Sequence, residues 1–305
     1  MRDQSPWRRD VLGASDAPAI AGVDPFRTSG DLWAAKTGRL PEPNAEDGDG
    51  MTAARVGQAL GPLLVDYTAR KLRRSVAAEV WYKHPTAPMA CTLDGIALEP
   101  PAFFIEAKTA GLLGPVLPQH AEEYGDDGTD EVPKAVVVQV HHSFAVLDAQ
   151  PDLPPIRDCY VPVLIGARGV RLYHVRCDEA LMANIYTMEV DWWRLYVEGD
   201  HCPPNDPPSL PTLKAMFRHP EAPARIVDPV LVSEWLQSKE ILKQAERNEE
   251  TCRRFVLNEL GDSEIGETTI GRVTYKAHSR AAYTVAAGTV RQLRFSPYGR
   301  ARAVA

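Results

Sequence analysis

The chain has 305 residues and a formal net charge of −7, with 44% hydrophobic and 25% charged residues. This is the composition of a globular protein with a substantial apolar core. No segment approaches the run of about 20 apolar residues that a membrane-spanning helix needs, and Met1–Asp10 lacks the apolar stretch of a secretory signal, so we expect a cytoplasmic protein without a membrane partner.

The apolar periodicity predicts a series of elements in the first two thirds of the chain. The first are a helix over 28–38, capped by Thr28 or Ser29 and ended by Gly38, and a helix over 56–72. Strands over 89–98 and 102–108 follow, and then a segment over 134–147 that fits strand or helix and whose length favours a helix. A hairpin over 160–175 and a helix over 179–196 complete this part. The acidic segment 120–130 is expected to be an exposed loop.

A Pro-rich stretch over 202–211, followed by Pro220, Pro223 and Pro229, is unsuited to a helix or a central strand. It divides the expected domains into a core over 1–201, a connector over 202–228 and a C-terminal unit over 229–305. In that unit we expect a long helix over 229–260, ended by Gly261, and a strand over 270–275. The order of elements indicates an α/β fold with a central mixed sheet flanked by helices.

Three residues near the predicted strands carry the main chemical signal. If the strands pair as neighbours, Asp94 and Glu106 face each other, and two converging carboxylates suit a hard divalent cation such as Mg²⁺. Glu106 and Lys108 share one face because the strand period is two, so the lysine points at the same centre. The pattern alone also fits a surface ion pair.

Other residues offer weaker signals. Five cysteines without a C-x-x-C pair argue against a zinc site, an iron–sulfur cluster or a disulfide framework. His141 and His142 are adjacent and point to different sides, which indicates core or surface histidines rather than a shared metal. The chain has no G-x-x-x-x-G-K-[ST] loop, so we expect no ATP hydrolysis.

Several motifs in order resemble the YqaJ-type viral recombinases and lambda-exonuclease-like nucleases, from about Trp7 onward. They are Leu12-Gly13-Ala14-Ser15-Asp16-Ala17, Asp31-Leu32-Trp33 with Lys36-Thr37-Gly38, Thr92-Leu93-Asp94-Gly95, Ile105-Glu106-Ala107-Lys108-Thr109, Gln139 in a V-Q-V context, and the hairpin that leads to Tyr173 and Asp178-Glu179. The resemblance implies a PD-(D/E)XK core, similar to restriction endonucleases, with a C-terminal long helix and a small strand extension.

By this resemblance, Asp94, Glu106 and the carbonyl of Ala107 bind Mg²⁺, for which Mn²⁺ is a possible substitute, and Lys108 is the catalytic lysine. Gln139 orients the active-site groups or the DNA, although a satisfied core amide remains the alternative. Ser15 and Arg8 fall where the family binds the DNA 5′-phosphate. For Ser15 the alternative is helix capping, and for Arg8 it is a solvated surface role.

One position departs from the family pattern. Gly61 stands where the family has a metal-binding glutamate, in the stretch Gly57-Gln58-Ala59-Leu60-Gly61-Pro62. Asp66 lies five residues further on, about 140° round a regular helix, and is a poor substitute. Metal affinity should fall as a result.

The resemblance implies a Mg²⁺-dependent 5′→3′ exonuclease that acts on double-stranded DNA ends and generates single strands for phage-type homologous recombination in a bacterial cytoplasm. It also implies a single-strand annealing protein as partner and a ring-like homo-oligomer. A basic channel inside a ring would reconcile DNA binding with the net charge of −7. The alternative is a weakened or inactive homologue that binds DNA ends or assembles with other proteins. A Cas4-like enzyme is disfavoured because it needs a cysteine cluster, and a restriction-type endonuclease because of the Ser15 opening and Gln139.

Overall fold

The computed structural model describes residues 9–40, 53–111, 123–217 and 225–277 of the chain. Two compact units are present, Met1–Ala222 and Pro223–Ala305. Among the helices in these ranges, none combines the length and apolarity needed to cross a membrane.

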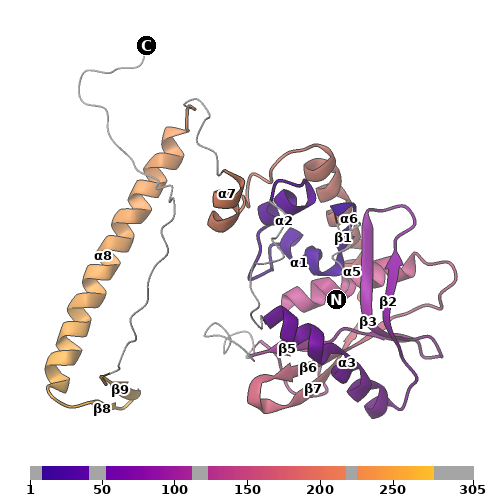
Figure 1. Ribbon diagram of the computed structural model, residues 1–305, viewed down its shortest axis with the longest axis horizontal. Helices are drawn as coiled ribbons and strands as arrows, with labels where there is room; N and C mark the ends of the chain where they lie inside the picture. Colours follow the sequence, from indigo (N-terminus) through magenta and orange to yellow (C-terminus); the bar gives the residue numbers. More distant parts are fainter. Residues whose placement is uncertain (1–8, 41–52, 112–122, 218–224, 278–305) are drawn as a thin grey trace. The chain divides into compact units, whose positions relative to one another are not determined.

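The first unit contains a mixed sheet in which two of the strands each pair with three others (Figure 1). β3 pairs in parallel with β1 and antiparallel with β2 and β4, while β6 pairs in parallel with β4 and β5 and antiparallel with β7. The sheet therefore has the mixed character expected from the sequence. Its strands are β1 (Leu12–Gly13), β2 (Ala77–Lys83), β3 (Met89–Ala97), β4 (Phe103–Ile105), β5 (Lys108–Ala110), β6 (Asp158–Ile165) and β7 (Val170–Arg176).

Helices cover both faces of this sheet, as alternate residues of β4 show. Phe103 and Ile105 pack with Val65 of α3 (Ala53–Leu72), whereas Phe104 lies in the other cluster and meets Phe144 of α5 (Lys134–Asp148) edge to face at 4.9 Å. α6 (Glu179–Trp192) packs on α5 and continues as a π-helical turn over Trp193–Glu198. The expected α/β architecture is thus a three-layer core.

The other predicted elements are confirmed with small shifts at their ends, but the strand predicted over 102–108 is divided into β4 and β5, with Glu106 and Ala107 in neither. Residues 134–148 form a helix, 158–176 form the hairpin across a 3₁₀ turn at Gly166–Arg168, and Thr28 caps α2 (Ser29–Lys36) by accepting from the Asp31 N–H. Part of the loop expected to be exposed is buried instead. Tyr124 is 9% exposed, and the Tyr173 hydroxyl and Arg171 guanidinium both donate to the Gly125 carbonyl.

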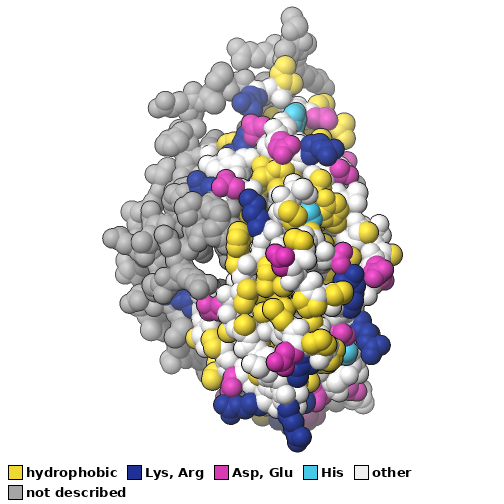
Figure 2. Space-filling view, turned by 90° about the vertical axis from the view of Figure 1, so that its right-hand side faces the viewer, with side chains coloured by type: hydrophobic (Ala, Val, Ile, Leu, Met, Phe, Trp, Pro, Cys, Tyr) yellow, Lys and Arg dark blue, Asp and Glu magenta, His cyan; other side chains and the backbone are white. Residues whose placement is uncertain are grey.

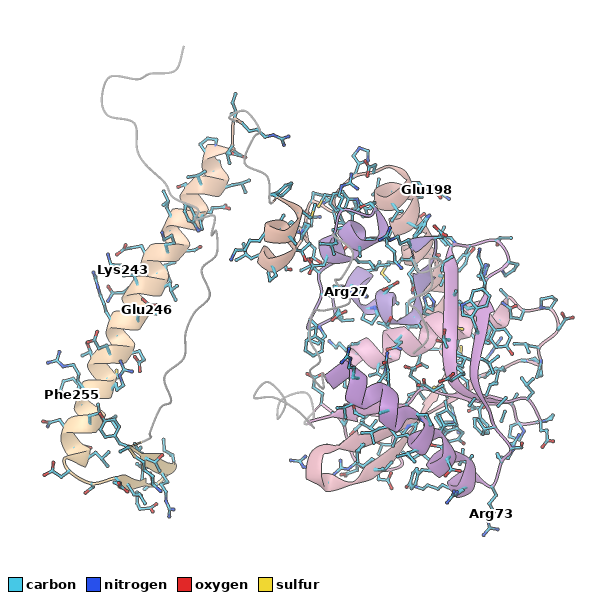
Figure 3. The ribbon with its side chains drawn as sticks, viewed as in Figure 1. Arg27, Arg73, Glu198, Lys243, Glu246 and Phe255 are labelled. Atoms are coloured by element: carbon cyan, nitrogen blue, oxygen red, sulfur yellow. The ribbon has the colours of Figure 1, made fainter. Side chains whose placement is uncertain are left out.

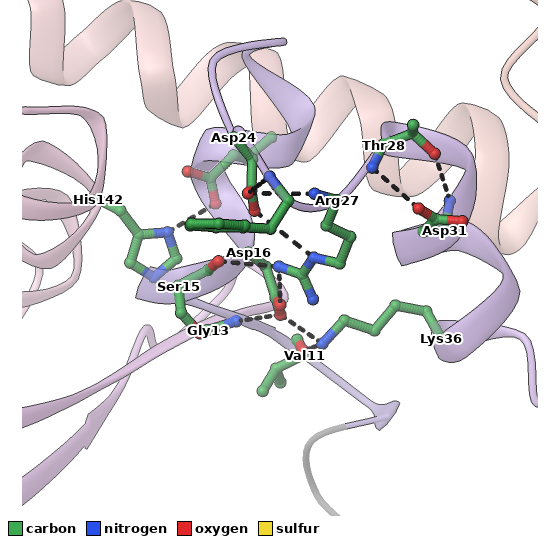
Figure 4. Close-up of polar contacts among 12 residues, drawn as sticks. Val11, Gly13, Ser15, Asp16, Asp24, Arg27, Thr28, Asp31, Lys36 and His142 are labelled. Atoms are coloured by element: carbon green, nitrogen blue, oxygen red, sulfur yellow. Dashed lines mark hydrogen bonds and ion pairs between the residues drawn. The ribbon is translucent and has the colours of Figure 1, made fainter. Parts of the chain in front are cut away.

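Ion pairs and hydrogen bonds of charged side chains connect the N-terminal segments, as Figure 4 shows. Asp16 ends the 3₁₀ turn Ala14–Asp16 and caps α1 (Ala17–Ile20), and its carboxylate accepts from Lys36 at 2.6 Å and from Arg27 at 2.9 Å. Burial alone would raise the pKa of Asp16, but these two cations more than offset it and lower the pKa below its ordinary value. Lys36 also donates to the Val11 carbonyl. This ion pair joins the two N-terminal motifs that were recognised separately in the sequence.

The Pro-rich connector packs against the start of α2. The Ser29 N–H donates to the Asp206 carboxylate at 2.6 Å, and the Ser209 N–H donates to Asp31 at 2.8 Å. A Cβ at Gly30 would lie 2.3 Å from the Pro208 nitrogen, so this close approach requires glycine. The connector also contains a helix, α7 (Leu210–Met216), which the sequence analysis did not allow. Pro211 is compatible with it because a proline in the first turn has no intrahelical acceptor to lose.

The described part of the second unit, residues 225–277, contains one long helix and a hairpin. α8 runs from Pro229 to Leu260, as the sequence predicts, and ends at Gly261, whose φ is +57°. β8 (Ile265–Thr268) and β9 (Gly271–Thr274) pair antiparallel.

A fully buried ion pair connects α5, α6 and β3. His142 and Glu189 are both 0% exposed, the imidazole Nδ1 lies 2.7 Å from the carboxylate, and Nε2 lies 3.0 Å from the Ala90 carbonyl. Burial alone would lower the pKa of His142, but these two acceptors more than offset it and raise the pKa. Both adjacent histidines therefore have structural roles, since His141 accepts the Asp178 N–H at the start of α6.

Removing one partner of this pair should be more harmful than removing both. We expect Glu189→Leu to reduce the free energy of unfolding by about 3–5 kcal/mol, because it leaves His142 buried without its counter-charge, and His142→Leu with Glu189→Leu to recover most of that loss. Urea unfolding checks both values. In the unaltered protein, the contribution of His142 is complete below its unfolded pKa of about 6.5 and is lost as pH rises through the raised folded pKa. If the free energy of unfolding of the double variant changed with pH as steeply as that of the unaltered protein, the buried His142–Glu189 ion pair would be contradicted.

Candidate active site

The strand that carries Glu106 is interrupted at the residues of chemical interest. Ile105 pairs with Tyr160 and Lys108 pairs with Val163, so β4 and β5 follow β6 in one register. The Glu106 N–H still donates to the Tyr160 carbonyl at 3.1 Å. The next ladder bond in this register would come from residue 162 to the Glu106 carbonyl. Residue 162 is a proline without an N–H, so the ladder is interrupted there.

Asp94 lies at this interruption. The β3–β4 register ends with Gly95 opposite Ile105, and one step further it brings Asp94 alongside Glu106. The Ala107 N–H points away from β6 and donates to the Asp94 carboxylate at 2.7 Å. In an extended strand the carbonyl of a residue points to the same side as its N–H. Ala107 lies between β4 and β5, and an extended backbone there would place its carbonyl on the Asp94 side. Its role as a metal ligand stays a prediction.

Glu106, Lys108 and Gln139 form a closed ring of hydrogen bonds. Glu106 Oε1 accepts from Lys108 Nζ at 2.8 Å and from Gln139 Nε2 at 2.7 Å, and Lys108 Nζ also donates to Gln139 Oε1 at 2.7 Å. The Glu106 side chain is 7% exposed, while that of Lys108 is 24% exposed. α5 thus contributes the amide that holds the glutamate and the lysine in one orientation.

The electrostatics of Asp94 reflect a crowded acidic site. Burial raises its pKa first, repulsion from Glu106 raises it further, and the Ala107 N–H and Lys108 only partly oppose this, so the pKa of Asp94 is about 7. Two carboxylates that repel each other in a largely buried site are stabilised by a cation between them. Asp94, Glu106 and the Ala107 carbonyl therefore fit a divalent metal ion, although no group of three or more His, Cys, Asp or Glu ligands exists in the parts of the chain that are described.

Sequence reasoning missed Glu79. It lies between the pairs Ala78–Gly95 and Val80–Leu93, where the register would place it opposite Asp94, and its φ is +52°. Its negative charge contributes to the raised pKa of Asp94. No motif marks this residue, and only the pairing of β2 with β3 brings it to the site.

The structure clarifies the consequence of Gly61. One turn before it, a Cβ at Gly57 would lie 3.4 Å from the Thr109 hydroxyl of β5, and one turn after it, Val65 lies against Gly95 of β3. Gly61 therefore faces the sheet between these contacts, next to the interruption. A Cβ there would meet nothing within 4 Å, so the position has room for a larger side chain. Asp66 does not replace the missing carboxylate, because it is exposed and pairs with Arg70 at 2.7 Å.

The residues expected to bind a 5′-phosphate are only partly described. Arg8 lies outside the described residues. Ser15 is exposed, and the alternative role of helix capping is wrong because Asp16 occupies the N-cap position of α1. The Ser15 carbonyl accepts from Arg27 at 2.8 Å, a neighbour that the sequence analysis did not single out. The charge of Arg27 is offset by Asp16 and Asp24.

One face of the molecule has no single sign of charge. Figure 2 shows one face of the molecule, where acidic and basic side chains are interspersed around a central apolar area. A pocket of about 570 Å³ lies elsewhere, lined among others by Phe26, Arg27 and Tyr196. None of Asp94, Glu106, Lys108 and Gln139 lines it, so we place the candidate chemistry at the sheet interruption rather than in this pocket.

Residues 5–150, which include all four of these side chains, match the family described as the YqaJ-like viral recombinase domain. The matched residues are slightly under half of the chain. The chain is also 28% identical over 204 residues to the uncharacterized protein YqaJ of Bacillus subtilis (strain 168), and the match covers 65% of this chain and 57% of that relative. The chain therefore spans a little over half the length of the curated relative.

Two solved structures are similar to this chain. The alkaline exonuclease LHK-Exo from Laribacter hongkongensis aligns with a TM-score of 0.45 and 16% identity, over 64% of this chain and 92% of that chain. The same enzyme in complex with dAMP aligns with a TM-score of 0.44 and 15% identity, over 63% and 90%.

The raised pKa of Asp94 can be tested directly. We expect a titration near pH 7 in the metal-free protein, observed by carboxyl carbon NMR. Glu106→Gln should lower this pKa, because it removes the repulsion, but should leave it above the ordinary value because burial remains. Glu79→Gln is the matched control and should give a smaller shift. An Asp94 pKa that does not change in the Glu106→Gln protein would contradict the shared site.

Proposed function

We propose that this chain is a divalent-metal-dependent deoxyribonuclease of the exonuclease type, with a PD-(D/E)XK active site centred on Asp94, Glu106 and Lys108. The observation that carries the proposal is the pair of adjacent, largely buried carboxylates with a lysine hydrogen-bonded to one of them. The match of residues 5–150 to the YqaJ-like viral recombinase domain supports a role in DNA recombination.

Each group of the site has a distinct task in this proposal. Asp94, Glu106 and the Ala107 carbonyl hold the metal, with Mg²⁺ as the natural ion and Mn²⁺ as a substitute. When bound, the ion lowers the pKa of a water molecule and offsets charge on the scissile phosphate. Lys108 orients the attacking water and stabilises negative charge that develops on the phosphate oxygens. Gln139 positions both Lys108 and Glu106 through its two hydrogen bonds.

The finer features of the proposal follow the family. Ser15 and Arg8 bind the 5′-phosphate of a duplex end, which makes digestion 5′→3′ and leaves single strands for an annealing partner. A hydroxyl and an arginine suit phosphate oxygens chemically. A ring-like assembly around DNA accords with the mixed surface charge, since only its channel has to be basic.

The second candidate function is that of a weakened nuclease that mainly binds DNA ends. The specific observation behind it is Gly61, which faces the sheet beside the active site and offers no ligand. With two carboxylates in place of three, metal affinity is lower, particularly for a second ion.

Loss of Glu106 should abolish cleavage without unfolding the protein. We expect Glu106→Ala to reduce digestion of linear 5′-phosphorylated duplex by at least about 10³-fold, because it removes a metal ligand and the acceptor that orients Lys108. A covalently closed circular duplex is the matched substrate and should resist the unaltered protein. Circular dichroism provides the folding control. Undiminished cleavage by a folded Glu106→Ala protein would exclude the assigned site, and cleavage of the circle would indicate an endonuclease.

Restoring the missing carboxylate separates the two functions. We expect Gly61→Glu to bind Mn²⁺ more tightly than the unaltered protein, as measured by calorimetry, and to digest DNA faster at limiting metal. Gly61→Gln is the matched control, because both changes should stabilise the helix by about 0.5–1 kcal/mol while only one adds a ligand. If only Gly61→Glu digests DNA, the natural chain is the end-binding form. Equal effects of the two variants would mean that position 61 does not reach the metal.

A further inference from the structure

The long helix of the second unit has an apolar stripe that is exposed to solvent. Leu231, Leu242 and Val256 are 60%, 59% and 45% exposed, and no residue of α8 is buried. Ile241 and Phe255 lie beside the stripe and are 64% and 71% exposed. Figure 3 shows Glu246 near the middle of this helix and Phe255 towards its C-terminal end. Apolar surface of this extent along one helix marks an interaction site.

The spacing of the stripe is that of a coiled coil. Starting at Leu231, core positions recur at alternating intervals of four and three residues, which is the heptad pattern. We call this set the α8 seam. Its apolar members are Leu231, Trp235, Leu242, Ala245, Cys252 and Val256, and its two polar members are Ser238 and Glu249.

From this pattern we infer that α8 pairs antiparallel with α8 of a second copy of the chain, about a two-fold axis between Leu242 and Ala245. In this arrangement two seam residues face each other when their residue numbers add up to 487. Leu231 of one copy therefore lies opposite Val256 of the other. Trp235 then faces Cys252, Leu242 faces Ala245, and Ser238 faces Glu249. Each bulky apolar side chain meets a smaller one, which fills the interface evenly.

A parallel pairing fits the same residues less well. It would place Glu249 against the same residue of the second copy inside the seam, and like charges at a buried position are strongly unfavourable. It would also put Trp235 against Trp235 and Ala245 against Ala245, which crowds one layer and leaves space in another. The antiparallel arrangement avoids all three conflicts.

Charge complementarity beside the seam supports the antiparallel choice. Lys239 and Glu246 each follow a seam residue on the same flank of α8, and the two-fold axis brings Lys239 of each copy opposite Glu246 of the other. The two contacts are related by the symmetry axis, and both are attractive. An isologous contact of this kind closes after two copies. It does not depend on the proposed nuclease activity.

Charge reversal in the full-length chain tests the pairing. We expect sedimentation to show association in pairs through α8, either of single chains or of the ring-like assemblies proposed above. Lys239→Glu or Glu246→Lys alone should weaken this pairing roughly tenfold, because each creates two like-charge contacts. The combined variant Lys239→Glu with Glu246→Lys should restore the dimer, because the attractive pairs return with their signs exchanged. In a parallel dimer these two positions do not face each other, and the combined change would not restore affinity.

A disulfide tests the register. In Trp235→Cys protein, mild oxidation should link residue 235 of one copy to Cys252 of the other. The two positions are 17 residues apart on one helix, about 25 Å, and therefore cannot bond within a chain. Adding Cys252→Ser is the matched control and should abolish the link. A chain that stays monomeric at high concentration would overturn the inference. It would indicate that the α8 seam is covered by another part of the chain or by another protein. A dimer that ignores the charge reversals and forms no such link would also overturn it.

Discussion

Two carboxylates lie close together at an interruption of the central sheet, and the arrangement of the polar groups around them depends on this repulsive contact. Asp94 and Glu106 are brought side by side by the β3–β4 register, in surroundings too dry to screen their repulsion. The protein offsets this charge with one main-chain N–H, one lysine and one amide. Pro162 contributes by removing a ladder donor next to Glu106, so the strand opens beside the two carboxylates.

The surrounding helices are held by other buried charges. The Asp16–Lys36 pair joins the N-terminal turn to α2, and the His142–Glu189 pair joins α5 to α6 and to the β3 backbone. α5 also supplies Gln139, so the pair that anchors this helix sets the position of an active-site amide three residues earlier. Core and site therefore depend on the same helix, because a shift of α5 would move Gln139 away from both of its partners.

The two units differ in how they satisfy their apolar surface. The first unit buries its apolar side chains on both faces of the sheet, whereas α8 has an apolar seam with no buried residue. A long amphipathic helix gains most of its stability from packing and not from intrinsic propensity. The second unit is thus suited to assembly, which places the proposed active site and the proposed association in separate parts of one chain.

The sequence by itself determined the elements whose signals are local. The cap at Thr28, the end of α8 at Gly261 and the spacing of Glu106 and Lys108 follow from hydrogen-bonding groups and periods within a few residues. The sheet order, the position of Glu79 beside Asp94 and the packing of the connector on α2 were decided only by the tertiary structure. These contacts join residues far apart in the chain, and their energy depends on which strands pair and which groups lose water, which no local pattern records.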